Sequence, residues 1–382
     1  LQPLNYQVNG EVMIAELEKI IPPLKKIVPQ ISADQVPNGH VKFNGAVIGK
    51  KKQIDVRATV NIEELTHDDV TVAAARSDGD WQIEGTEVTG RTEGFVTDIG
   101  YDEHRFPRLD LFVLLSPEDI KADLKLAKDT GEEFQLSGII DQWQQESRRI
   151  QLDTLKVTGI TEPLNRVIPE IHNPEPIQME IHPDSIDIDN MRLAAGSTVF
   201  QMQGRLSREG SQGLQLSLTG LDLNQLAALW QEEPDVQGQL TAEVELGGTS
   251  ESPTIDAQVT VKKPSGYEIS LSDLDLRLAY ENRSASIMAQ GFRKGEKIFD
   301  LEGRSGLTLR LWPFDFTPEP GSLRANFDAK DIKLSEWPNP VRHKVAIDGL
   351  ATIQLQATGD LLQPQLTGFL SLKEGYLELP KH

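Results

Sequence analysis

Apolar and polar residues alternate with a period of two along most of the chain. The alternation is clear between Gln53 and Ile62, and it recurs between Val236 and Val261 and between Ile347 and Leu372. A period of two places successive side chains on opposite faces of a strand, so each run predicts a β-strand with one apolar face. Turn signals such as Gly247-Gly248 and Lys294-Gly295 separate the runs. The sequence therefore predicts a mainly β protein whose strands follow one another in an antiparallel sheet.

Helical spacing is confined to a few short segments. The stretch from Gly10 to Ile21 predicts a helix that ends at two prolines, and "LKKIVPQI" predicts a second short helix. Further along, Asp222 to Trp230 predicts a helix capped by its first residue, and 331–337 predicts a short helical turn. So little helix cannot cover a long sheet. The sheet must therefore close on itself, pair with a second sheet, or enclose a ligand.

Two of the alternating runs are copies of one pattern at a constant offset of 111 residues, from 236 to 347. At this offset the copies share a leading glycine, a threonine, a turn glycine (Gly248 and Gly359) and a proline (Pro253 and Pro364). Glycine permits a positive φ in the turn, and proline fits the first residue of a strand, where no ladder N–H is lost. A short helical stretch precedes each copy, so the repeating module is helix, strand, glycine turn, proline and strand.

This module resembles the TamB family, within the AsmA-like, bridge-type lipid-transfer proteins of the cell envelope. The resemblance is carried by "LTGLDLNQLAALWQEEPDVQGQLTAEVELGGTSESPTIDAQVTV" (Leu218–Val261) and is echoed by "GDLLQPQLTGFLSLKEGYLELP" near the end. It covers about Ile177 to Pro380. It implies a long antiparallel sheet curled into an open groove, the β-taco, with a few short capping helices. We expect 1–38 to be a helical cap or junction, 39–175 an antiparallel β segment, and 176–382 the TamB-like groove repeats.

The family resemblance also implies what such a groove would do. Its apolar side would carry phospholipid acyl chains between the inner and outer membranes, without a cofactor. The chain would be a middle or C-terminal periplasmic segment, tethered to the inner membrane through a part that it lacks, with a TamA-like barrel-assembly partner at the outer membrane. The residues expected to contact lipid are Leu240, Ala242, Val244, Leu246, Ile255, Ala257, Val259, Val261, Leu274, Leu276, Leu278, Ile353, Leu355, Leu366, Leu370 and Leu372.

Composition narrows the classes of function. The 382 residues carry 38 basic and 59 acidic side chains, a net charge of −21, which disfavours nucleic acid and an anionic membrane surface as partners. The absence of cysteine excludes disulfides, thiolate metal sites and a cysteine nucleophile. The sequence contains no run of about 18 apolar residues, which is the length that a helix needs to cross a membrane. Because the chain starts at Leu1, we expect a processed protein or a piece of a longer one.

The sequence gives little support for a catalytic or metal site. His172 and His182 have no metal-ligand spacing, and the acidic stretch 182–190 lacks the glycine and the final glutamate of an EF-hand. No nucleophile elbow, phosphate loop or dinucleotide motif follows a suitable strand. We therefore expect no enzyme and no metal. The aromatic stretch "LWPFDFTPEPG" (311–321) could rim a groove or pack on an edge as a loop.

Three alternatives to a lipid conduit remain open. The apolar positions could form the dry core of β-sandwiches. The sheet edges could instead receive strands of outer-membrane proteins by β-augmentation, as an assembly factor would. The chain could also be a structural stalk that binds neither.

Overall fold

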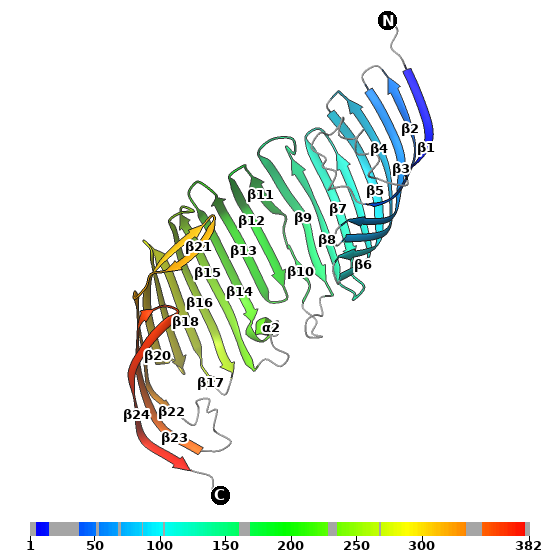
Figure 1. Ribbon diagram of the computed structural model, residues 1–382. Coiled ribbons are helices and arrows are strands. Elements are labelled where there is room, and N and C mark those ends of the chain that lie inside the picture. The colour runs from blue at the N-terminus through cyan, green and yellow to red at the C-terminus, as the bar shows by residue number, and fades with distance from the viewer. Residues whose placement is uncertain are drawn as a thin grey trace. The chain divides into compact units, whose positions relative to one another are not determined.

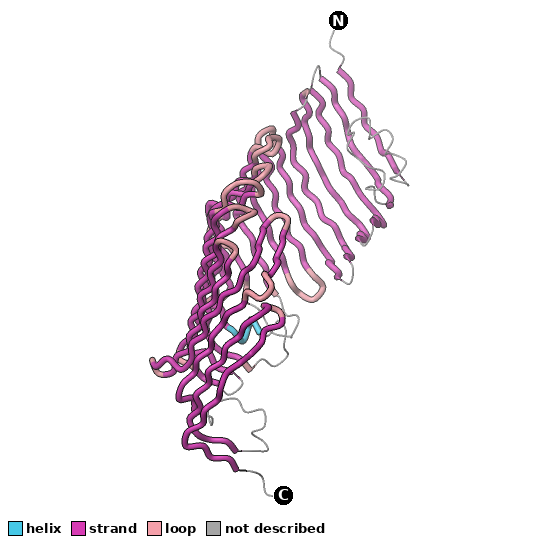
Figure 2. The backbone as a smooth tube through the Cα atoms, turned by 60° about the vertical axis from the view of Figure 1, so that its left-hand side comes forward, coloured by secondary structure: helices cyan, strands magenta, loops and turns pink. Residues whose placement is uncertain are grey.

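The computed structural model of the chain describes residues 5–14, 38–50, 53–67, 70–85, 87–101, 104–159, 169–227, 235–266, 269–333 and 346–378. These residues form 24 strands and one short helix. The chain divides into two compact units, Leu1–Ile181 and His182–His382. In both units the long strands follow one another in sequence order across the sheet, whereas the short β10, β17 and β21 are side pairings (Figures 1 and 2). The prediction of a mainly β, curled antiparallel sheet with very little helix is confirmed.

Unit 1 is an antiparallel meander in which β1 to β9 pair in sequence order, and both β10 and β11 pair with β9. Its long strands have 9 to 15 residues, because the alternating runs of the sequence are long. The strands are β1 (Asn5–Ile14), β2 (Asn38–Lys50), β3 (Gln53–His67), β4 (Val70–Glu84), β5 (Glu87–Tyr101), β6 (His104–Leu115), β7 (Asp119–Ala127), β8 (Glu133–Asp141), β9 (Arg148–Thr158), β10 (Ile171–His172) and β11 (Ile177–Ile181).

Unit 2 follows the same plan from β12 to β24. The short β17 pairs with β16, and β21 pairs with the second half of β20 as a separate two-stranded ribbon. The elements are β12 (Ser185–Ala195), β13 (Thr198–Ser207), β14 (Gly213–Asp222), α2 (Leu223–Ala227), β15 (Val236–Gly248), β16 (Pro253–Gly266), β17 (Ile269–Ser270), β18 (Asp273–Glu281), β19 (Ser284–Arg293), β20 (Glu296–Leu311), β21 (Phe314–Pro318), β22 (Leu323–Lys333), β23 (Ala346–Asp360) and β24 (Gln363–Glu378).

Glycines on the apolar side show the direction in which each sheet bends. A Cβ built on Gly94 would lie inside van der Waals contact of the Arg76 carbonyl oxygen, on the adjacent strand. In unit 2, a Cβ on Gly368 would meet the Gln354 carbonyl oxygen in the same way. At these two positions the neighbouring backbone lies so close on the apolar side that a Cβ would clash with it. We conclude that each sheet bends toward its apolar face at these positions.

The helix predicted from Gly10 to Ile21 is wrong over its first five residues, which belong to β1. Tyr6, Val8, Gly10, Val12 and Ile14 share one parity and pair with alternate residues of β2, so the period-two pattern extends back to the start of the strand. This strand pattern was missed because the apolar residues from Gly10 onward also have the spacing of a helix. The remainder of that prediction, and the second short helix after it, lie outside the described residues.

The other two helical predictions have different outcomes. The helix expected from Asp222 is confirmed as α2 over Leu223–Ala227, and its last three residues lie outside the described range. The turn expected at 331–337 is wrong over its first three residues, which extend β22. Ile332 is only 2% exposed in a cluster with Ala329 and Ala351, and this burial favours the strand over the local turn. The rest of that turn also lies outside the described residues.

Candidate functional site

The predicted lipid-contacting residues lie on one face of the unit 2 sheet. Register partners in an antiparallel pair share a face, and the residues of β15, β16 and β18 are partnered in rows. One such row is Ala242, Val259 and Leu276, and the next is Val244, Ala257 and Leu278. The structure therefore brings together the eleven predicted residues of these three strands as one block.

The five predicted residues of β23 and β24 form a second block on the same sheet face. Ile353 is opposite Leu370, and Leu372 is opposite Ala351. Leu366 is opposite Ala357, and Leu355 is opposite Gly368. Between the register shifts at Gly291/Phe292 and Ala329/Ile332, the rows through Leu276 and Leu278 continue across β19, β20 and β22 and connect the two blocks.

Several members of this face were not among the predicted residues. The row through Val259 also includes Leu193, Phe200 and Leu218 on one side and Ala289 and Leu301 on the other. Further members were missed because register shifts in β14 and β22, and single glycines such as the one at 303, interrupt the alternation. The residues of this face that lie outside the predicted set include Met202, Phe200, Leu216, Leu218, Ala285, Ile287, Ala289, Phe299, Leu301, Ala325, Phe327, Ala329 and Ala357.

Unit 1 has an equivalent apolar face. The row Leu111, Leu124, Leu136 and Leu155 crosses four strands in register. The parallel row Leu115, Ile120, Ile140, Ile150 and Met179 lies on the same side of the sheet. None of these residues was among the predicted contacts, although the period-two signal is as clear there as in unit 2.

Exposure of these side chains separates a groove wall from a packed core. Of the sixteen predicted residues only Val261 is buried, at 5% exposed. Leu278 and Leu355 are 38% and 39% exposed, and Leu370 reaches 67%. In a β-sandwich the inward-facing residues of two sheets interdigitate, and such positions would be closed to solvent. Within the described residues, the apolar face of unit 2 is a half-exposed surface rather than a sandwich core.

The opposite face of the unit 1 sheet is polar and carries the ion pairs. Arg57 Nε lies 2.5 Å from Asp80 Oδ1, and Arg108 Nη2 lies 2.6 Å from Asp110 Oδ1. The hydrogen bond from Arg57 holds the pKa of Asp80 below its usual value, and Arg108 does the same for Asp110. These carboxylates face solvent, so each pair contributes little to stability. The pattern is that of a solvated outer surface.

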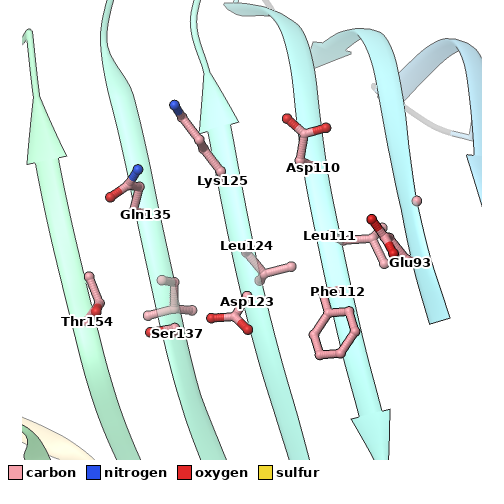
Figure 3. Close-up of a pocket in the computed structure, with 12 residues that line it drawn as sticks. Glu93, Asp110, Leu111, Phe112, Asp123, Leu124, Lys125, Gln135, Ser137 and Thr154 are labelled. Carbon is pink, nitrogen blue, oxygen red and sulfur yellow. The ribbon is translucent and has the colours of Figure 1, made fainter. Parts of the chain in front are cut away.

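A shallow depression of about 500 Å³ lies on this polar face between β5 and β9 (Figure 3). Glu93, Asp110, Phe112, Asp123 and Lys125 are among the residues that line it. Its charges are of both signs, and Lys125 forms a 3.1 Å ion pair with Glu133. Ser137 and its register partner Asp123 both line it, and no hydrogen bond joins these two described side chains. The apolar face, with its continuous rows of one chemistry, is therefore the stronger candidate site.

His172 and His182 each lie beside one carboxylate. His182 Nε2 lies 3.0 Å from Asp187 Oδ2, and Arg205 Nε lies 3.6 Å from Oδ1 of the same carboxylate. His172 lies in β10, with Nδ1 3.7 Å from a Glu170 carboxylate oxygen. Among the described residues no group of three His, Asp or Glu could hold a metal ion. The same part of the chain includes no helix long and apolar enough to cross a membrane.

Comparison with known proteins identifies one family. A family model described as "TamB, N-terminal domain" matches residues 7–372. The match includes residues 7–175, to which the sequence resemblance did not extend, and it is to the N-terminal domain rather than to a middle or C-terminal segment. No curated protein and no solved structure matches the chain.

Proposed function

This chain belongs to the TamB family of cell-envelope proteins, and from that premise we propose that it carries phospholipid along the apolar face of its sheets. The observation that supports the proposal is the registered, half-exposed apolar face of unit 2. Its rows run across the strands from β13 to β24, and among the described elements only the ribbon of β20 and β21 packs on them, over Ile255, Tyr280 and Ala285 at one end. A surface of this extent on a protein of net charge −21 favours a ligand that is itself apolar.

Acyl chains fit the chemistry of this face. The side chains are mainly Leu, Ile, Val and Ala, which offer area for apolar burial but few hydrogen-bonding groups. Binding would then depend on the apolar area removed from water, at about 25 cal/mol per Å². A lipid bound in this way could slide from row to row without losing a specific contact. Its headgroup would remain in water beyond the strand ends, so headgroup selectivity would be weak along the face.

The proposed setting is the periplasm, with the chain as part of a bridge between the two membranes. The TamB family is associated with a TamA-type partner at the outer membrane, and we propose the same kind of partner for this protein. The segment that would tether it to the inner membrane is a proposal from the family resemblance alone.

Lipid content is the direct test. Native mass spectrometry of the purified chain, followed by organic extraction, should detect co-purifying phospholipid. A photoreactive side chain at Leu276, on the apolar face, should crosslink that lipid, whereas one at Arg277, on the other face, should not. A lipid-free mass together with absence of crosslinks from Leu276 in lipid-containing extracts would refute the proposal.

Strand binding is the second candidate function, and one feature favours it. β24 pairs with β23 along one side, and no described strand pairs with its other edge. It exposes an apolar side chain on each face, with Phe369 54% and Leu370 67% exposed. An edge of this kind can receive an extended strand by β-augmentation. Crosslinks from β24 to unfolded barrel strands, without lipid crosslinks from Leu276, would favour assembly over transport.

A further inference from the structure

The second half of β20 turns away from the main sheet and pairs with β21. We call Leu307–Leu311 and Phe314–Pro318 together the ribbon. Figure 1 shows β21 crossing the direction of β15 and β16 rather than running alongside them. Its position is fixed by Tyr280, which is 4% exposed and lies in the same apolar row as Ile255. The Tyr280 hydroxyl donates to the Leu307 carbonyl oxygen at 3.2 Å and accepts from the Leu309 N–H at 3.0 Å.

The apolar side of the ribbon faces the apolar side of the sheet. Leu307 and Leu309 are 6% and 9% exposed and pack against Tyr280, Ile255 and Ala285. These three residues all lie on the apolar face of unit 2. The ribbon is thus placed at the end of the trough that the proposed function requires, on the side where lipid would lie.

The second strand of the ribbon presents aromatic side chains that nothing described covers. Phe316 is the register partner of Leu309, and Phe314 is the partner of Leu311, so both share the ribbon face that packs on the sheet. Yet Phe316 is 49% exposed and Phe314 is 73% exposed. They continue the apolar surface past the last row of the sheet.

A cation lies over the Trp312 ring, at the turn between the two strands of the ribbon. Arg208, in the turn after β13, has its guanidinium carbon 5.6 Å from the centre of the Trp312 ring. Backbone hydrogen bonds fix the approach, because Leu311 N donates to the Ser250 carbonyl oxygen at 2.8 Å and the Ser250 hydroxyl donates to Ser207 O at 2.9 Å. The Arg208 guanidinium makes no ion pair with any described residue. Its charge is available to an anion.

We propose that Arg208, Trp312, Phe314 and Phe316 form a phospholipid-binding site at the rim of unit 2, the rim site. The aromatic rings would contact the acyl chain, and the Arg208 guanidinium would bind the headgroup phosphate. The exposed apolar surface alone would fit any apolar partner. The Arg208 guanidinium, which forms no ion pair with a described residue, favours a ligand with an anionic head and an apolar tail. The site would hold a lipid where it enters or leaves the trough, and it would make headgroup recognition local to the rim.

This inference rests on the proposed lipid-binding function, and crosslinking from three positions separates the two. A benzoylphenylalanine is placed singly at Val259 in the trough, at Phe316 on the apolar side of the ribbon, and at Thr317 on its opposite side. The full 382-residue chain is incubated with phosphatidylethanolamine vesicles and irradiated. The rim site predicts lipid crosslinks from Phe316 and none from Thr317. Crosslinks from Val259 without any from Phe316 would overturn the rim site and leave the trough. Crosslinks from Phe316 alone would overturn the trough and keep the rim site. None from either position would overturn both.

The role of the cation needs a second comparison. Arg208→Gln should lower crosslinking of phosphatidylethanolamine from Phe316 about fivefold, since an exposed charge pair contributes little more. Crosslinking of diacylglycerol, which has no phosphate, should not change. Arg277→Gln, which removes an exposed arginine from the polar face, is the matched control and should have no effect. An equal loss for both lipids would show that Arg208 acts only by positioning Trp312, and would overturn the phosphate contact.

Discussion

Replacing Val259 with aspartate would place a carboxylate in the middle of the apolar face of unit 2. Val259 lies on β16 between Ala242 and Leu276, and its side chain is half-buried. A fully buried valine contributes about 1.5–3 kcal/mol, so loss of the half-buried side chain should cost the fold only about 1 kcal/mol. In the lipid-free protein the new carboxylate can be hydrated. Val259→Asp should therefore fold.

Lipid binding should respond much more strongly than folding. An acyl chain lying across this row would strip water from the carboxylate, and burying a polar group without a partner costs roughly 2–7 kcal/mol. Because the aspartate can still reach some water from an open trough, we take a value of about 3 kcal/mol. This corresponds to a loss of about two orders of magnitude in local occupancy. The expected result is a folded chain with little lipid at this row.

The matched control is one residue away. Gln258 is exposed and points to the other face of the same strand, so Gln258→Asp adds the same charge outside the trough. Lipid per chain is measured by native mass spectrometry, and folding by circular dichroism and thermal melting. We expect Val259→Asp to lose lipid and Gln258→Asp to retain it. Unchanged lipid content in a folded Val259→Asp protein would refute the reasoning, and equal losses in both variants would show that net charge rather than the face decides.

Three further predictions follow from the fold. Gly94→Ala should lower the melting temperature, at a cost of about 1–3 kcal/mol, because its Cβ would clash with the adjacent backbone, whereas Gly10→Ala, with no atom within 4 Å of the new methyl, should not; equal melting points would contradict the bend at Gly94. Tyr280→Phe should cost about 1–2 kcal/mol and speed amide exchange in the ribbon, because two hydrogen bonds are lost; unchanged exchange would refute the anchoring role. Arg57 lowers the pKa of Asp80, so the pair stabilises the fold above the unfolded-state pKa of aspartate, and this contribution is lost as the pH falls through the lower, folded-state pKa. The free energies of unfolding of the wild type and of Asp80→Asn, measured by urea titration, should therefore become equal at low pH. A difference that stays constant with pH would contradict this.

The strand pattern could be predicted from the sequence because period two is a local property. The alternation from Val236 to Val261 specified both the strands and the face of each residue, since adjacent side chains must point to opposite sides. The turn glycines and prolines fixed where the strands reverse. Where helical spacing and period-two spacing overlapped, the local pattern gave a wrong prediction. Gly10–Ile14 has helical spacing from its first residue, but pairing with β2 makes it a strand.

The alignment of strands into rows needed the tertiary structure. A row such as Phe200, Leu218, Ala242 and Val259 joins residues that are far apart in the sequence, and a shift of one residue in any strand would move its apolar side chains to the other face. Register depends on turn geometry and on bulges, neither of which the alternation specifies. The half-exposure of that face could not be predicted either, because the same pattern would fit a sandwich core.

At the rim of unit 2, too, the sequence predicted one part and only the structure showed the rest. The sequence identified 311–321 as the richest aromatic stretch and left two interpretations of it open. Only the structure shows that Tyr280 anchors the ribbon on the apolar side and that Arg208, about a hundred residues earlier in the chain, lies over Trp312. Local backbone geometry sends adjacent side chains of a strand to opposite faces, so the sequence alone was sufficient to predict which residues share a face within one strand. Which distant side chains meet is determined by long-range pairing, and this required the fold.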